Sequence, residues 1–69
     1  MNSAILKRFG KKVKALRLER GISQEKLGEL AKVHRTYVGM IERGEKNITL
    51  GNIHKIANAL KVKPCDLVE

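Results

Sequence analysis

Apolar residues recur at helical spacing along most of this 69-residue chain. The first stripe has steps of three, four and three and consists of Leu6, Phe9, Val13 and Leu16. This period predicts a helix over about residues 3–20, with one face turned to a core. Gly21 is suited to end it, because glycine tolerates the left-handed backbone that follows many helices.

Two short helices are predicted next. Ser23 is a favourable N-cap for a helix over about 24–32, since its hydroxyl can accept from free amides of the first turn. Its inner face is predicted to hold Leu27, Leu30 and Ala31. Val33 connects this helix to a third, in which Val38 and Ile41 turn inward and which ends at Gly44.

The last third of the chain predicts two more helices. Thr49 is a suitable cap for the first of them, whose apolar positions are Leu50, Ile53, Ile56, Ala57 and Leu60. Pro64 fits the first turn of a short final helix, where a missing N–H costs nothing. The pattern therefore predicts an all-α, compact five-helix bundle, with residues 1–69 forming one domain.

Charge narrows the class of partner. The formal net charge is +8 and the pI about 10.1, a balance that favours a polyanion. Nucleic acid is the first candidate and an acidic membrane surface the second. Several of the cations lie off the apolar stripe of the first helix: Lys7, Arg8, Lys11, Lys12 and Lys14. They form either a solvated face or a set of phosphate contacts.

The sequence argues against an enzyme. His34 and His54 lie 20 residues apart without a Cys or carboxylate at zinc spacing, and no glycine-rich phosphate loop is present. We therefore expect no catalytic residue, metal or cofactor. Cys65, the only cysteine, is expected to be inert filling. Without a long apolar run or a signal peptide, the chain is expected to be cytoplasmic and to have no membrane partner.

The segment HRTYVGMIERG, residues 34–44, has poor helix propensity, because β-branched, aromatic and glycine residues stand in succession. It follows another short helix after a tight turn and begins with a basic residue, an arrangement typical of a helix-turn-helix over about 24–43. Small or β-branched residues on the groove side of such a helix allow close approach to base edges. Binding to double-stranded DNA explains this choice of residues.

The string SQEKLGELAKVHRTYVGMIERG resembles the helix-turn-helix of the phage repressor and Cro superfamily, whose lambda-repressor-like fold the chain is expected to share. HRTY and ERGEKNITLGNIHKIANAL are especially similar to controller proteins of restriction–modification systems, which are small dimeric transcription regulators. Xenobiotic-response-element-type regulators, prophage repressors and antitoxins share much of the pattern. A sequence-specific transcription regulator is the expected function, with a prophage-type repressor or antitoxin-like regulator as the alternative.

The resemblance implies roles for individual residues. Base reading is implied for Arg35, Thr36, Gly39 and Met40. Phosphate contact is implied for Gln24, Tyr37, Arg43, Lys46 and Asn47, although partial burial of Tyr37 is equally open. A structural ion pair is implied between Arg17 and Glu42, and His34 corresponds to the cap before the recognition helix.

Two positions depart from the superfamily pattern. Gly28 stands where a small Ala is usual at the helix crossing, and Lys32 stands where many members have Gly. Either Lys32 adopts a positive φ or the turn differs.

The resemblance also implies a homodimer, because one recognition helix offers few base contacts and a pair spaced by about 34 Å reads two half-sites. Candidate interface residues are Val62, Leu67 and Val68, unless they close the core of the monomer. No small-molecule effector is expected, since no second domain is apparent to sense one.

Overall fold

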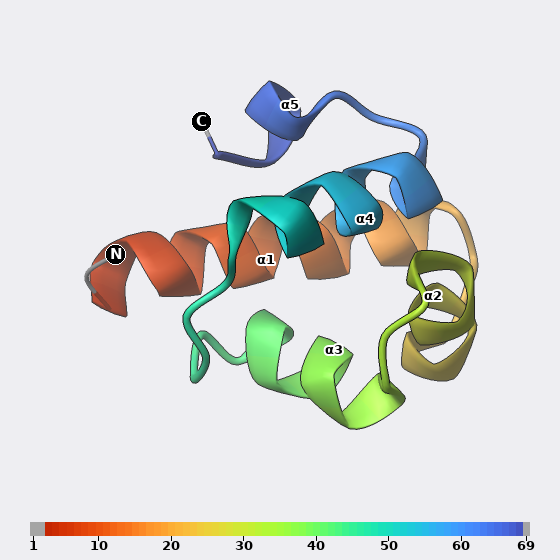
Figure 1. The fold of residues 1–69 in the computed structure, drawn as a ribbon, viewed down its shortest axis with the longest axis horizontal. Coiled ribbons are helices and arrows are strands. Elements are labelled where there is room, and N and C mark those ends of the chain that lie inside the picture. Colours follow the sequence, from red (N-terminus) through yellow and green to blue (C-terminus); the bar gives the residue numbers. More distant parts are fainter. Residues whose placement is uncertain (1–2, 69) are drawn as a thin grey trace.

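The structure, a computed structural model, describes residues 3–68. Over this range the chain forms five helices and no strand: α1 (Ser3–Glu19), α2 (Gln24–Ala31), α3 (Arg35–Glu42), α4 (Leu50–Leu60) and α5 (Pro64–Val68). In Figure 1, α1 runs behind the other helices along the length of the molecule, with α2 on the right, α3 below and α5 above. The predicted all-α five-helix architecture is confirmed for these residues.

The helices begin and end where local chemistry predicted. The hydroxyl of Ser23 accepts from the Lys26 amide at 2.9 Å, and that of Thr49 accepts from the Asn52 amide at 3.1 Å. Each satisfies an amide that has no partner inside its helix. Gly21, which follows α1, has φ +66°, the left-handed backbone expected there.

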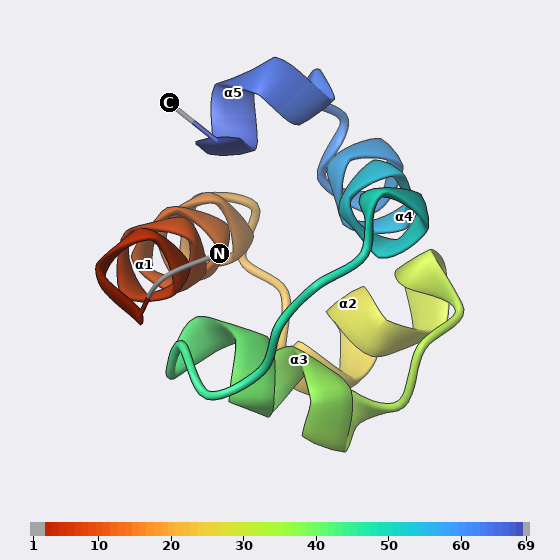
Figure 2. The ribbon, with the colours of Figure 1, turned by 60° about the vertical axis from the view of Figure 1, so that its left-hand side comes forward.

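The core lies at the centre of the five helices, which surround it in Figure 2. It is formed by Phe9, Val13, Leu27, Ala31, Val38, Ile41, Ile53, Ile56, Ala57, Leu60 and Leu67. Since every helix contributes at least one of these side chains, burial of apolar surface holds the helices in one arrangement. No helix among the described residues is long and apolar enough to cross a membrane.

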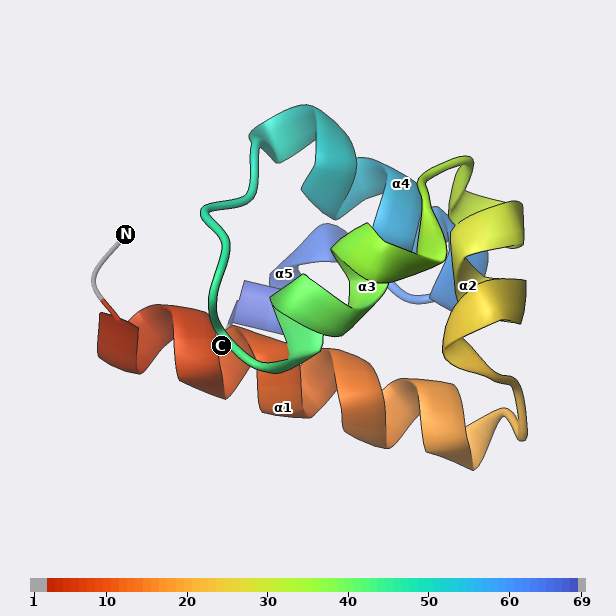
Figure 3. The same cartoon turned by 90° about the horizontal axis from the view of Figure 1, so that it is seen from below.

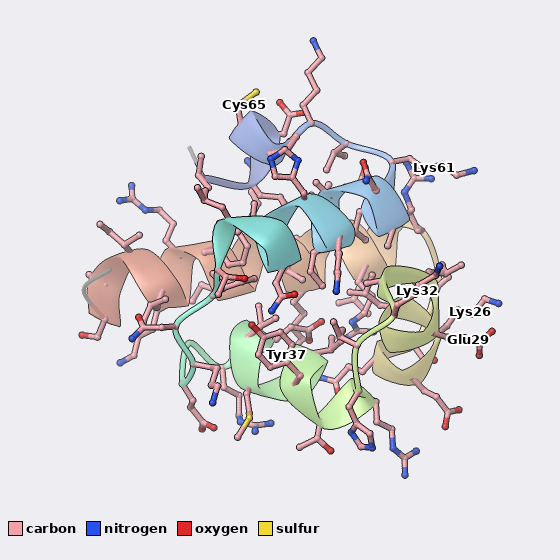
Figure 4. The ribbon with its side chains drawn as sticks, viewed as in Figure 1. Lys26, Glu29, Lys32, Tyr37, Lys61 and Cys65 are labelled. Carbon is pink, nitrogen blue, oxygen red and sulfur yellow. The ribbon has the colours of Figure 1, made fainter. Side chains whose placement is uncertain are left out.

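Two sequence predictions about burial are wrong, and one open alternative is resolved. Leu30 is 48% exposed, because α2 packs through Leu27, Gly28 and Ala31 and Leu30 lies off that face. Cys65 is exposed and fills no interior space, as Figure 4 shows at the top of the molecule. For Leu67, which is only 1% exposed, the second alternative holds: it closes the core of the monomer, so its side chain is not free apolar surface for a partner.

Candidate nucleic-acid interface

A tight crossing of α2 and α3 sets the direction of the candidate recognition helix. Lys32 has φ 60°, so the first of the two alternatives at this position holds. The turn is closed by the Val33 amide, which donates to the Gly28 carbonyl at 2.9 Å. A Cβ on Gly28 would lie 2.7 Å from the Val33 carbonyl oxygen. Glycine is therefore required by this close approach, and an Ala would push the two helices apart.

His34 caps α3. Its backbone is extended, and its Nδ1 accepts from the Thr36 amide at 3.0 Å. The predicted cap position is confirmed, with an imidazole nitrogen in place of the usual hydroxyl or carboxylate oxygen. This contact fixes the first turn of the helix, which bears Arg35 and Thr36, both exposed.

Arg35 projects from the start of α3 and is held by a residue of α2. Its Nη1 lies 3.1 Å from Oε2 of Glu25, and the two side chains are 64% and 70% exposed. Such an exposed pair contributes little to stability. Its effect is geometric, because one nitrogen of the guanidinium has a fixed neighbour while the other donors stay available.

Gly39 lies underneath polar side chains and does not itself form the outer surface. The residue is buried, and a Cβ at this position would lie 3.1 Å from Arg43 Nη1 and 3.6 Å from Gln24 Oε1. The missing side chain leaves room for Gln24 and Arg43 to lie across the helix. The base-reading role that the resemblance implied for Gly39 is corrected accordingly, because these side chains cover it, whereas Met40, one residue on, is half-buried.

Arg17 and Glu42 form the expected ion pair and tie α1 to the end of α3. Arg17 Nε lies 2.7 Å from Glu42 Oε2, and Arg17 Nη2 donates to Oε1 at 3.2 Å. The Arg17 and Glu42 side chains are both buried, and each makes a further hydrogen bond. Arg17 Nη1 donates to the Ile22 carbonyl at 2.8 Å, and Gln24 Nε2 donates to Glu42 Oε1 at 3.1 Å. Gln24 is thus joined to the structural cluster as well as standing at the front of α2.

Tyr37 links α3 to α4. It is half-buried against the core, and its hydroxyl accepts from Asn52 Nδ2 at 2.9 Å. Figure 4 shows its ring lying between the two helices. Because the amide nitrogen can only donate, the phenolic proton is not used in this contact and is free to donate elsewhere.

The turn after α3 presents the remaining polar candidates. Gly44 has φ +71°, and Arg43 pairs with Glu45 at 3.0 Å. Lys46 and Asn47 follow and are exposed. From below, Figure 3 shows this segment leaving α3 beside α1 and rising to α4. Arg35 and Lys46 therefore lie near opposite ends of one helix.

Two residues that the sequence did not single out belong to this surface. Glu25 holds Arg35, and Asn52 holds Tyr37. They lie 10 and 15 residues from their partners, so no local spacing rule pairs them. Only the packing of α2 and α4 against α3 brings them together.

Comparison with known proteins identifies the class. A model of the helix-turn-helix family matches residues 13–67. Control protein C.BamHI of Bacillus amyloliquefaciens is 50% identical over 62 residues, 88% of this chain and 76% of that protein. The immunity repressor protein of Bacillus phage phi105 is 36% identical over 59 residues, 86% of this chain and 41% of that protein.

A solved structure shares the fold. The restriction-modification controller protein C.AhdI from Aeromonas hydrophila superposes with a TM-score of 0.91 at 45% identity, covering 93% of this chain and 97% of that one. This chain belongs to the helix-turn-helix family. It is a DNA-binding transcription regulator of the type to which the restriction–modification controller proteins belong.

Proposed function

We propose that α3 enters the major groove of an operator, with Arg35 and Thr36 reading base edges at its start and Met40 one turn later. The observation that supports this orientation is the division of α3 into two faces. Val38, Ile41 and Glu42 are buried, while Arg35 and Thr36 are exposed. The outward face alone is free to contact bases.

Arg35 is the proposed principal reader. Its guanidinium has five N–H donors, of which Glu25 contacts one nitrogen. The donors that remain are sufficient for a bidentate contact with guanine O6 and N7, worth about 1 to 3 kcal/mol of discrimination. Thr36 is suited to a thymine methyl group or a phosphate.

We propose that the phosphate backbone is contacted on both sides of this helix. Gln24 lies at the front of α2, where amides without helical partners point outward, and it keeps one amide N–H after its bond to Glu42. Tyr37 contributes its free phenolic proton. Arg43, Lys46 and Asn47 follow α3 on the other side. Such contacts fix the register of the protein on the duplex, whereas the contacts with bases recognise the sequence.

We further propose that the protein binds as a homodimer, so that two recognition helices meet successive major grooves about 34 Å apart. Val68 on α5 is 56% exposed, and Val62 is half-buried at the edge of the core. These two residues support an interface there. Replacing Val68 with Asp should shift sedimentation toward the monomer, and an unchanged dimer would place the interface elsewhere.

We propose control of a restriction–modification operon as the biological role. Control protein C.BamHI and controller protein C.AhdI match this chain at 50% and 45% identity, and the phage immunity repressor matches at 36%. A methyltransferase and an endonuclease encoded beside this chain would support the proposal. An integrase in their place would favour the prophage-type alternative.

The test begins with selection of bound sequences from a random duplex pool, which gives the operator. On that operator Arg35→Ala should weaken binding far more than on mixed-sequence duplex of the same length. Lys46→Ala should weaken both alike and lower the salt slope by about one. Equal losses on the two duplexes for Arg35→Ala would contradict base reading by this residue.

A further inference from the structure

The basic half of α1 has an arrangement of charge that folding does not explain. Residues 7–14 contain five cations and no acid. Four pairs among them stand three or four residues apart, where like charges face each other and destabilise a helix. All five are exposed, and the ion pairs found within residues 3–68 involve none of them. A solvated face chosen for stability would interleave acids with these lysines.

One side of α1 is fixed against the candidate DNA-binding unit. A Cβ on Gly10 would collide with the Ile41 carbonyl oxygen, so α3 and α1 are in backbone contact there. Seven residues later on the same row, Arg17 bonds to Glu42. The row therefore faces α3.

Lys7 continues this row to the turn that follows α3. A Cβ on Gly44 would lie 2.7 Å from Lys7 Cγ, so the turn that contains Arg43 and Lys46 rests directly on the stem of Lys7. In Figure 3 the same turn passes beside the N-terminal half of α1. The proposed phosphate-binding turn and the start of α1 therefore form one continuous surface.

Helical geometry places two further lysines beside Lys7. Lys14 falls on the row that faces α3, between Gly10 and Arg17, yet it is exposed, so it lies at the margin of the contact. Lys11 stands four residues after Lys7 and three before Lys14, which makes it their neighbour. We call Lys7, Lys11 and Lys14 the α1 lysine stripe. At about 100° per residue, Arg8 and Lys12 each lie about 100° further round α1 than Lys7 and Lys11, on the side turned away from α3.

We propose that the α1 lysine stripe is a second interaction surface, which binds the sugar-phosphate backbone bordering the half-site read by α3. The proposal rests on the proposed function, because it takes the operator as the occupant. Phosphates would supply the negative charge that residues 7–14 lack, and the stripe would add affinity without sequence preference. The operator covered by each subunit would then extend beyond the base pairs that α3 contacts.

The two sides of α1 offer a matched test. The Lys11→Gln/Lys14→Gln and Arg8→Gln/Lys12→Gln variants each remove two charges from the same helix and introduce a good helix former. Each relieves like-charge pairs, so thermal unfolding followed by circular dichroism should show no loss of stability in either. Lys7 is left unchanged, because its stem packs against Gly44.

Binding is then measured by fluorescence anisotropy against salt concentration, on the selected operator and on mixed-sequence duplex of equal length. Lys11→Gln/Lys14→Gln should lower the magnitude of the salt slope by about 1 to 2 on both duplexes and leave their affinity ratio unchanged. Arg8→Gln/Lys12→Gln should change the slope by less than half as much.

Two results overturn the proposal: equal changes in slope for the two variants, or no change for Lys11→Gln/Lys14→Gln. Neither result touches base reading, which is judged by the affinity ratio of the unmodified protein between operator and mixed-sequence duplex. A ratio near one would instead contradict the proposed function itself.

Discussion

α3 and α4 begin alike and are held in place by different interactions. Each follows an extended cap residue, His34 or Thr49, whose side chain accepts from an amide of the first turn. α4 buries four apolar side chains, whereas α3 buries two. The other contacts that hold α3 in place are polar or involve the backbone. They are the ion pair of Glu42 with Arg17 and the close approaches of backbone at Gly10 and Gly28.

This difference is consistent with the proposed role of α3 in DNA binding. A helix that lies in a groove presents one face to DNA and has little surface left for a core. Its position must then be fixed by directional contacts, which weaken steeply when their geometry changes. α4 does not need to leave a face free for DNA, and burial of its apolar surface holds it in place. The predictions below test whether α3 depends on its polar and backbone contacts in this way.

The largest effect is expected from Glu42→Ala. It leaves the Arg17 guanidinium buried without its carboxylate and removes the acceptor of Gln24, and breaking such a pair costs about 3–5 kcal/mol. Urea unfolding followed by circular dichroism measures the loss of stability. DNA binding should fall with it, although Glu42 is buried and is not itself a proposed DNA contact.

Glu45→Ala is the control for this change. It breaks the exposed pair with Arg43, in which the side chains are 57% and 54% exposed, and such pairs are worth about 0–1 kcal/mol. Similar losses of stability for Glu42→Ala and Glu45→Ala would show that α3 does not depend on its buried ion pair.

A smaller effect is expected from Gly28→Ala. The new methyl group would meet the Val33 carbonyl, and overpacking of this kind costs about 1–3 kcal/mol. Because backbone must move to relieve it, the angle between α2 and α3 should change, and binding to the selected operator should weaken more than binding to mixed-sequence duplex.

Gly51→Ala gives the matched comparison in α4. A Cβ there has only Thr49 Oγ1 as a neighbour, at 3.9 Å, so the variant should gain up to about 1 kcal/mol from better helix propensity. If Gly28→Ala proved equally stabilising, the close crossing of α2 and α3 would be refuted.

These contacts mark the limit of what the sequence could predict. Caps such as Ser23 and Thr49 depend on neighbours a few residues away, and their helices were predicted correctly. Leu30 was assigned to the wrong environment, because periodicity identifies an apolar face without saying which residues at its margin are covered. The two alternatives for Leu67 could be decided only by the packing of α5 on the core. The Arg17–Glu42 pair was expected only through a family resemblance, since its members are 25 residues apart.

The proposed interface shows the same limit. Arg35, Thr36 and Lys46 were found from their places in the helix-turn-helix pattern, and the structure leaves all three exposed. Glu25 and Asn52 were not found, because each acts on a partner in another helix. Local rules therefore locate the elements of the interface, and tertiary packing decides which side chains support them.

A smaller loss of global stability than that of Gly28→Ala is expected from His34→Ala. Loss of the bond to the Thr36 amide removes the cap of α3 and costs about 1 kcal/mol. Thr49→Ala removes the cap of α4 in the same way and at a similar cost. The two variants should therefore unfold at nearly equal urea concentrations, and only His34→Ala should weaken discrimination between operator and mixed-sequence duplex. The reason is that its cap fixes the turn that bears Arg35, in a helix of only eight residues.

His34→Asn, which supplies another favourable cap, should restore that discrimination. If Thr49→Ala impaired it as strongly, the first turn of α3 would have no special dependence on its cap.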